Sequence, residues 1–238
     1  MARPQTIKPT LYAISVGPGE PKLMTMQAIE RLQQTPVVAW LQNPQGHSRA
    51  YAAAQPYIQS HQQQRPYTLS MQASPQSKST TYDAIATSLK QELDNGKDVA
   101  FLVLGDVTLY ASFHALALRL QGAYPIVMLP GISAISAGAT YLGLSLAQQT
   151  DNLHILTPPI EQEQLTTLTS QGNTVVVMKP CGHLSAIRAC IEHDPALDAV
   201  LIDNITLPTQ RVVPLDSYKE DTAPYFSMLL LHRKKGVS

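Results

Sequence analysis

The chain has 238 residues and a mass of 25.9 kDa, enough for one large domain or two domains of about 120 residues each. Seventeen Lys and Arg residues balance seventeen Asp and Glu residues, which excludes a partner held mainly by counterion release from nucleic acid. Charged residues make up only 14% of the chain, but a hydrophobic content of 44% excludes a disordered protein.

Cysteine usage and apolar runs indicate the compartment. The two cysteines, Cys181 and Cys190, are too few for a disulfide scaffold, and we interpret them as reduced thiols. The first ten residues contain no apolar signal-peptide core, and no uninterrupted apolar run approaches the length of a membrane span. The sequence therefore predicts a cytoplasmic globular protein that makes no contact with a membrane.

Short β-branched runs alternate with helical stretches in the first part of the chain, which predicts an α/β fold. The glutamine-, serine- and proline-containing stretch at residues 59–80 is predicted to form a surface loop or lid. The predicted strands are residues 11–16, 37–40, 98–104 and 126–129, and the predicted helices are residues 22–34, 50–58, 80–93, 109–120 and 133–141.

A second α/β series follows a polar stretch near residues 145–152. We place the domain boundary there, which gives an N-terminal domain of residues 1–147 and a C-terminal domain of residues 148–238. The strands predicted for the second domain are residues 153–156, 173–178, 199–202 and 225–231, and its helices are residues 162–170 and 184–193.

Three glycine-containing turns follow predicted strands of the first domain: Gly17-Pro-Gly19, Gly105-Asp106 and Pro130-Gly131. Ligands of open α/β sheets bind beyond the carboxyl ends of the strands, so these turns are candidates for a binding site. The dinucleotide pattern G-x-G-x-x-G fails because Lys22 stands at its last position. Spacing alone leaves open whether the turns hold a ligand or only reverse the chain.

The residues beside these turns can be interpreted either as ligand contacts or as parts of a helix start. Asp106 either lies against a polar edge of a ligand or caps the helix that follows, and the two roles are compatible. Ser133 and Ala134 either present backbone and hydroxyl groups at the start of a helix to the same ligand or form only the N-cap of that helix. We expect a bulky residue at Gly105 to block the ligand with little change in the fold.

Other kinds of active site find little support. The seven histidines are scattered without metal-ligand spacing, and Cys181 with His183 gives only two ligands, so we expect no metal. The nucleophile elbow G-x-S-x-G of serine hydrolases is absent. The residues taken alone predict a two-domain α/β protein with a cleft for a small molecule, and they identify no catalytic residue.

Four motifs, in order over almost the whole chain, resemble those of the tetrapyrrole methylase family, whose members use S-adenosylmethionine. VGPGEPKLMT at residues 16–25 resembles the family's VGPGDPxLLT, and GDVTLY at residues 105–110 resembles its GDPxxY. LPGISA at residues 129–134 resembles VPGISA, and DNIT at residues 203–206 with Gln210-Arg211 resembles ENATxxxQR. Met178-Lys179 and Tyr225-Phe-Ser227 are similar to the branch of precorrin-2 C-20 methyltransferases.

The resemblance implies two α/β domains with S-adenosylmethionine in the cleft between them, its product S-adenosylhomocysteine, and a homodimer. It also implies methylation of C-20 of precorrin-2, or of the cobalt-bearing substrate, in cobalamin biosynthesis. The positions that match the family's cofactor contacts are Pro18, Leu104, Gly105, Asp106, Leu109, Ser133, Ala134, Met178 and Ile205.

The substrate implied by the resemblance carries several carboxylates, so basic side chains are expected to bind it. Arg49, Lys179 and Arg211 are the candidates, against the alternative that each is solvated or structurally paired.

Two positions depart from the family pattern. Glu20 stands where Asp is usual, and Val107 replaces a proline, which adds a backbone N–H that needs a partner.

Two alternatives to a precorrin-2 methyltransferase remain. The first is another methyltransferase of the same superfamily, acting on a different precorrin position or on RNA, although the neutral charge disfavours RNA. The second is a binding protein that retains the fold and the cofactor but not catalysis, which the departures at Glu20 and Val107 motivate. The sequence does not distinguish the metal-free substrate from the cobalt-bearing one.

Overall fold

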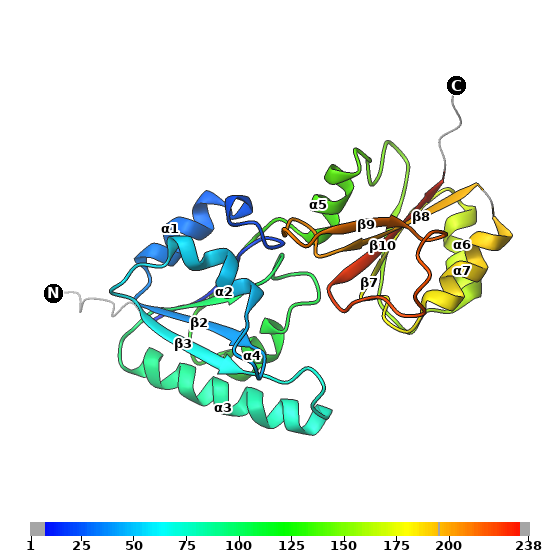
Figure 1. Ribbon diagram of the computed structural model, residues 1–238. Helices are drawn as coiled ribbons and strands as arrows, with labels where there is room; N and C mark the ends of the chain where they lie inside the picture. The colour runs from blue at the N-terminus through cyan, green and yellow to red at the C-terminus, as the bar shows by residue number, and fades with distance from the viewer. Residues whose placement is uncertain (1–7, 195, 234–238) are drawn as a thin grey trace. The chain divides into compact units, whose positions relative to one another are not determined.

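The computed structural model describes residues 8–194 and 196–233. The chain divides into two compact units, and the division falls between Ser133 and Ala134. Each unit has one five-stranded sheet. Helices pack on each sheet, as Figure 1 shows. The predicted architecture of two α/β domains is therefore confirmed.

The sheet of the first unit is entirely parallel, in the order β3-β2-β4-β1-β5. The central strand β4 and its neighbour β1 are buried on both faces, as expected for a parallel sheet covered by helices on each side. The strands are β1 (Leu11–Ser15), β2 (Val37–Gln42), β3 (Gln63–Thr68), β4 (Val99–Val103) and β5 (Ile126–Leu129).

Helices cover both faces of this sheet. Along β4, Phe101 points to the face covered by α3 and α4, whereas Leu102 points to the face covered by α1 and α2. The helices are α1 (Met26–Gln34), α2 (Arg49–Ala54), α3 (Pro75–Asp94) and α4 (Phe113–Leu120), with short 3₁₀ turns η1 (Pro21–Leu23) and η2 (Gln55–Tyr57). Thr25, Ser48 and Ser74 cap α1, α2 and α3 by accepting backbone N–H hydrogen bonds.

The sheet of the second unit is mixed, in the order β6-β7-β10-β8-β9. Only β6 and β7 pair in parallel, and every other neighbouring pair is antiparallel. Helices α6 and α7 pack on one face and α5 packs on the other. The elements are α5 (Ala134–Tyr141), β6 (Leu153–Leu156), α6 (Gln162–Ser170), β7 (Thr174–Met178), α7 (Leu184–His193), β8 (Leu197–Asp203), β9 (Arg211–Pro214) and β10 (Ser227–Arg233).

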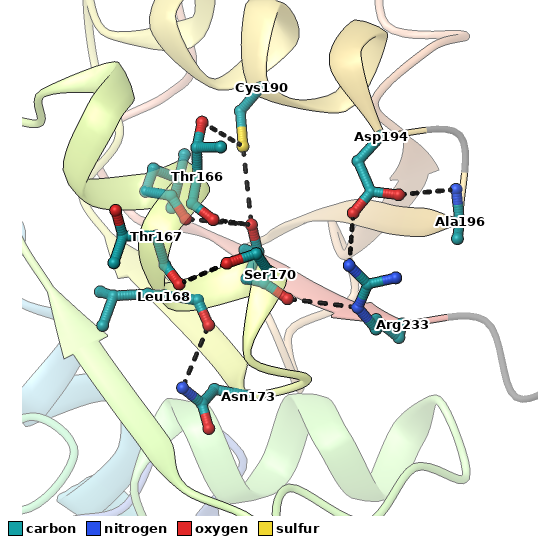
Figure 2. Close-up of polar contacts among 11 residues, drawn as sticks. Thr166, Thr167, Leu168, Ser170, Asn173, Cys190, Asp194, Ala196 and Arg233 are labelled. Atoms are coloured by element: carbon teal, nitrogen blue, oxygen red, sulfur yellow. Dashed lines mark hydrogen bonds and ion pairs between the residues drawn. The ribbon is translucent and has the colours of Figure 1, made fainter.

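Polar contacts fasten α6, α7 and β10 to one another (Figure 2). The hydroxyl of Thr166 on α6 donates to the buried Sγ of Cys190 on α7 at 3.6 Å. On β10, Arg233 forms an ion pair of 2.7 Å with Asp194, the residue that follows α7. Cys181 and Cys190 are both free thiols, as predicted, and Cys190 has a packing role.

Several predicted element bounds are wrong. The stretch predicted as a loop, residues 59–80, contains β3 and the first turn of α3. The helix predicted from residue 22 begins at Met26 after a 3₁₀ turn, and the helix predicted from residue 109 begins at Phe113. The edge strand β9 was not predicted. Both missed strands lie at sheet edges, where backbone hydrogen bonds suffice without the apolar run that marks a buried strand.

The division between the units lies earlier in the chain than the predicted boundary after residue 147. Helix α5 and the residues after it pack on the second sheet, where Ile135 and Ala139 join a buried cluster with Ile202 and Met228. Gly138 lies against Met228 of β10, so that an added Cβ would overlap its side chain. The small residues of α5 therefore belong to the core of the second unit.

Candidate functional site

The predicted glycine turns meet at the carboxyl edge of the first sheet. Gly17 follows β1 and Gly105 follows β4, and these two strands are neighbours. The Gly105 N–H donates to the Gly17 carbonyl at 2.7 Å, and the Gly17 N–H donates to the Gly105 carbonyl at 3.3 Å. Both residues are left-handed, with φ of 75° and 77°, a conformation that glycine adopts without steric cost.

The third turn packs against the first two. A Cβ added to Gly131 would lie 2.5 Å from Ser15 Cβ and 2.7 Å from the Gly105 carbonyl oxygen. Ser15 is the last residue of β1 and is fully buried. Only a residue without a side chain fits at position 131, so all three turns form one packed set of loops.

Asp106 fastens two of these loops together. One carboxylate oxygen accepts the Gly131 N–H at 2.8 Å, and the other accepts the Thr108 N–H at 2.8 Å and the Thr108 hydroxyl. Burial raises the pKa of this carboxyl, but the hydrogen bonds from Gly131 and Thr108 outweigh it and hold the pKa below its usual value. Helix α4 begins at Phe113, so the reading of Asp106 as the cap of that helix is wrong.

The backbone N–H of Val107, which a proline at this position would lack, forms a hydrogen bond. It donates to the hydroxyl oxygen of Ser15 at 2.9 Å, inside the protein. Both residues are buried, at 0% and 1% exposure. The sequence identified the need for a partner, but Ser15 lies 92 positions away and is brought close only by the pairing of β1 with β4.

The backbone at Gly105 is open to a ligand. An ideal Cβ at this position would meet no heavy atom within 4 Å, so a molecule can approach the main chain closely. Leu109, further along the same loop, is 37% exposed, and its neighbour Tyr110 is left-handed and 44% exposed. An added side chain at Gly105 would clash with no protein atom, but a φ of 77° strains it, so a bulky residue there should lower stability as well as block the ligand.

Four further cofactor candidates and the substrate candidate Arg49 occupy different surroundings. Pro18 is buried within the first glycine turn, and Leu104 packs on the cluster beneath α1 and α2. Ser133 is the last residue of the first unit, whereas Ala134 begins α5 and packs in the second. Arg49 is the first residue of α2 and is half-buried.

A second group of predicted residues lies at one edge of the second sheet. Met178 ends β7, Lys179 follows it, and Ile205 follows β8. The side chain of Ile205 is 7% exposed and packs in the core, so only its backbone can face a ligand. Arg211 begins β9, and its guanidinium forms an ion pair of 3.7 Å with Glu220 and lies over the ring of Tyr218. These contacts agree with the alternative that Arg211 is structurally paired.

Two aromatic residues that the sequence did not assign to a site stand beside Lys179. Tyr225 and Phe226 are 40% and 45% exposed, and their rings meet edge to face with centroids 5.1 Å apart. The Lys179 ammonium lies 5.3 Å from the centroid of the Tyr225 ring. The group combines exposed aromatic surface with a positive charge, a combination that suits a conjugated ligand with carboxylates.

The backbone around this group is unusual. Lys179, Asn204 and Thr206 are left-handed although none is glycine, and such conformations concentrate at functional sites. The Lys179 N–H donates to the Ser227 carbonyl at 3.1 Å, and the Asn204 N–H donates to the Phe226 carbonyl at 3.2 Å. These bonds join the ends of β7 and β8 to the segment that carries the two aromatic rings.

The described part of the chain has neither a candidate metal cluster nor a candidate membrane span. Residues 8–194 and 196–233 hold no group of three or more His, Cys, Asp or Glu side chains arranged to bind a metal ion. No helix in these same ranges is long and apolar enough to cross a membrane.

Two curated relatives match almost the whole chain. The chain is 29% identical to the cobalamin biosynthesis protein CobIJ of Mycobacterium tuberculosis over 93% of its own length, but it spans only 46% of that relative. It is also 29% identical to the precorrin-2 C(20)-methyltransferase of Sinorhizobium sp, covering 93% of this chain and 94% of the relative.

A solved structure has the same fold. The uroporphyrin-III C-methyltransferase of Thermus thermophilus complexed with S-adenosylhomocysteine aligns with a TM-score of 0.66 and 18% identity, over 94% of this chain and 97% of that one. The family model of the tetrapyrrole (corrin/porphyrin) methylases matches residues 10–218. This chain belongs to the tetrapyrrole methylase family.

Proposed function

We propose that this chain is an S-adenosylmethionine-dependent methyltransferase that methylates C-20 of precorrin-2 or of its cobalt-bearing form in cobalamin biosynthesis. Family membership and the Sinorhizobium relative, matched over nearly its whole length, support this reaction. The observation that carries the proposal is the meeting of three family motifs in one set of packed loops, at Gly17, Gly105 and Gly131.

The loops of the first unit fit the cofactor. The open space over the Gly105 backbone admits a ligand, and Leu109 offers apolar surface on the same loop. When bound, S-adenosylmethionine supplies an activated methyl group on a positively charged sulfur. The proposed cofactor contacts are Pro18, Leu104, Gly105, Asp106, Leu109, Ser133, Ala134, Met178 and Ile205, and a place for the cofactor between the two domains stays a prediction.

The substrate provides the nucleophilic carbon, so the chain needs no covalent nucleophile. Its task is to hold that carbon in line with the methyl group, and such positioning contributes several kcal/mol to lowering a barrier. We assign the tetrapyrrole ring to the exposed faces of Tyr225 and Phe226, and its carboxylates to Lys179, with Arg49 and Arg211 as further candidates. No residue is assigned as a general base.

We also propose that the chain acts as a homodimer in the cytoplasm. The family resemblance supports the dimer, and the low charged fraction of 14% is consistent with a surface that is partly covered by a second copy.

The test is methyl transfer with defined substrates. Incubation with ¹³C-methyl-labelled S-adenosylmethionine and either precorrin-2 or cobalt-precorrin-2 is expected to give a singly methylated product, with the label located at C-20 by NMR. A label at another carbon would assign the chain to a different methyltransferase of the family. Tight binding of S-adenosylhomocysteine without turnover of either substrate would indicate a binding protein that lacks catalysis.

A further inference from the structure

The loop from Asp106 to Leu109 is a β-turn with one buried hydrogen bond to strand β1. The Leu109 N–H donates to the Asp106 carbonyl at 3.2 Å, which closes the turn with Val107 at its second position. The Val107 N–H therefore points away from the turn, and it donates to Ser15 Oγ at 2.9 Å. Neither Ser15 nor Val107 is exposed to water that could replace this bond.

Ser15 also touches the third loop. Its Cβ occupies the place that a Cβ on Gly131 would need, so Ser15 lies against both the Asp106 turn and the Gly131 turn. The same two turns are joined by the bond from the Gly131 N–H to the Asp106 carboxylate. One side chain from β1 therefore contacts both neighbouring loops.

A proline at position 107 would make the Ser15 hydroxyl unnecessary. Proline has no N–H, and the second position of such a turn favours it because its φ is fixed near −65°. Val107 is not among the residues with a positive φ, so its backbone does not exclude proline on that ground. The chain thus carries a residue pair, Ser15 with Val107, where a proline alone would fix the turn.

We propose that Ser15 is a positioning residue for the cofactor loop and that its hydroxyl replaces the conformational restraint of a proline at position 107. This inference rests on the proposed function, because it assumes that the loop binds S-adenosylmethionine. Without the hydroxyl, the turn populates conformations in which Val107 N–H reaches water and the loop no longer fits the cofactor. The apparent dissociation constant then rises in inverse proportion to the competent fraction.

The test compares Ser15→Ala with the double variant Ser15→Ala/Val107→Pro, using calorimetric titration with S-adenosylhomocysteine. Alanine keeps the Cβ that lies against Gly131 and removes only the oxygen. Ser15→Ala is expected to weaken binding about tenfold, the scale for leaving a buried donor unpaired. The double variant is expected to regain most of this affinity, because no N–H is left without a partner.

Thr35→Val is the matched control. Thr35 is a buried residue of the same unit whose hydroxyl donates to the Arg31 carbonyl at 2.7 Å, away from the glycine loops. This variant is expected to lower the melting temperature but to leave the dissociation constant unchanged. It separates a general loss of stability from a displaced loop.

The outcomes distinguish this inference from the proposed function. A wild-type chain that does not bind S-adenosylhomocysteine contradicts the proposed function itself. A wild-type chain that binds while Ser15→Ala binds equally well overturns the role of Ser15. If Ser15→Ala binds weakly and the folded double variant binds equally weakly, the lost partner of the Val107 N–H is not the cause and the inference is also overturned.

If the double variant fails to fold, amide hydrogen exchange at Val107 in Ser15→Ala provides the test. Exchange faster than in the wild type is expected, and unchanged exchange contradicts the inference.

Discussion

Gly131 shows how closely the loops at the carboxyl edge of the first sheet are packed. Its added Cβ would lie 2.5 Å from Ser15 Cβ and 2.7 Å from a backbone oxygen of Gly105, and neither neighbour is the flexible end of a side chain. We expect Gly131→Ala to destabilise the protein by about 1–3 kcal/mol, the usual cost of overpacking. Because the loops must separate, binding of S-adenosylhomocysteine should weaken as well.

Thermal unfolding and calorimetric titration check this prediction against Gly122→Ala. Gly122 has a φ of 81°, but its added Cβ would meet nothing within 4 Å, so that variant carries backbone strain without a clash. Its melting temperature should fall while its cofactor affinity stays at the wild-type value. If Gly131→Ala binds S-adenosylhomocysteine as tightly as the wild type does, separation of the loops does not affect binding and the prediction is wrong.

Tyr225 is the residue on which the proposed substrate contact depends most. Its ring is 40% exposed and lies under the Lys179 ammonium, which adds positive charge beside an aromatic face. Tyr225→Leu should raise the Michaelis constant for the tetrapyrrole about three- to tenfold, the scale of an aromatic contact, and leave S-adenosylhomocysteine binding unchanged. Tyr225→Phe keeps the ring and should behave like wild type.

Steady-state kinetics at saturating cofactor provide the measurement, and Tyr141→Leu provides the control. Tyr141 is also exposed, at 62%, but it ends α5 and has no assigned contact with substrate. If Tyr225→Leu and Tyr141→Leu change the Michaelis constant to the same small extent, Tyr225 does not contact the tetrapyrrole.

At the scale of elements, β10 carries a histidine that ties stability to pH. His232 pairs across the sheet with Asp198 of β8, and among the described residues its buried Nδ1 has no hydrogen-bond partner. Burial lowers the pKa of His232 below the usual 6.5, and the charge of Asp198 only partly opposes this shift. The unfolded chain therefore binds this proton more readily than the native one.

Stability should consequently fall as the pH drops below about 6.5, where the unfolded histidine gains its proton and the native one does not. Urea unfolding at pH 7.5 and pH 5.5 measures this loss, which should be smaller in His232→Gln than in wild type. His47→Gln, at an exposed position, should retain the wild-type dependence. An unchanged pH dependence in His232→Gln would contradict the prediction.

The elements differ in how far their sequence specifies them. Strand β4 was predicted almost to the residue because all five of its side chains are buried and apolar. Strand β3 was missed because its sequence, QQRPYT, begins with three polar residues and a proline and therefore resembles a loop. Its strand conformation comes from backbone pairing with β2, which the sequence of β3 alone does not reveal.

For the whole molecule, the homodimer is the open prediction. A dimer should sediment at twice the 25.9 kDa of the chain at micromolar concentration. Sedimentation velocity over a concentration series measures this mass, and a species of one chain at every concentration would contradict the prediction.

The sequence by itself determined the family, the α/β class and the three glycine turns of the first unit, because motifs and apolar runs are local and their order along the chain is sufficient. The motif also predicted Met178 and Lys179 as site residues, and this assignment stays a prediction. Tyr225 and Phe226 were seen only as a branch signature, since sequence does not show that two aromatic rings remain exposed.

Only the tertiary structure decided what the site residues contact. Asp106 holds the Gly131 loop, Ile205 turns its side chain into the core, and α5 joins the second unit. The partner of the Val107 N–H is Ser15, from a strand far away in sequence. These contacts depend on which strands become neighbours in the sheet, and strand order is fixed by the packing of the whole domain and not by any single segment.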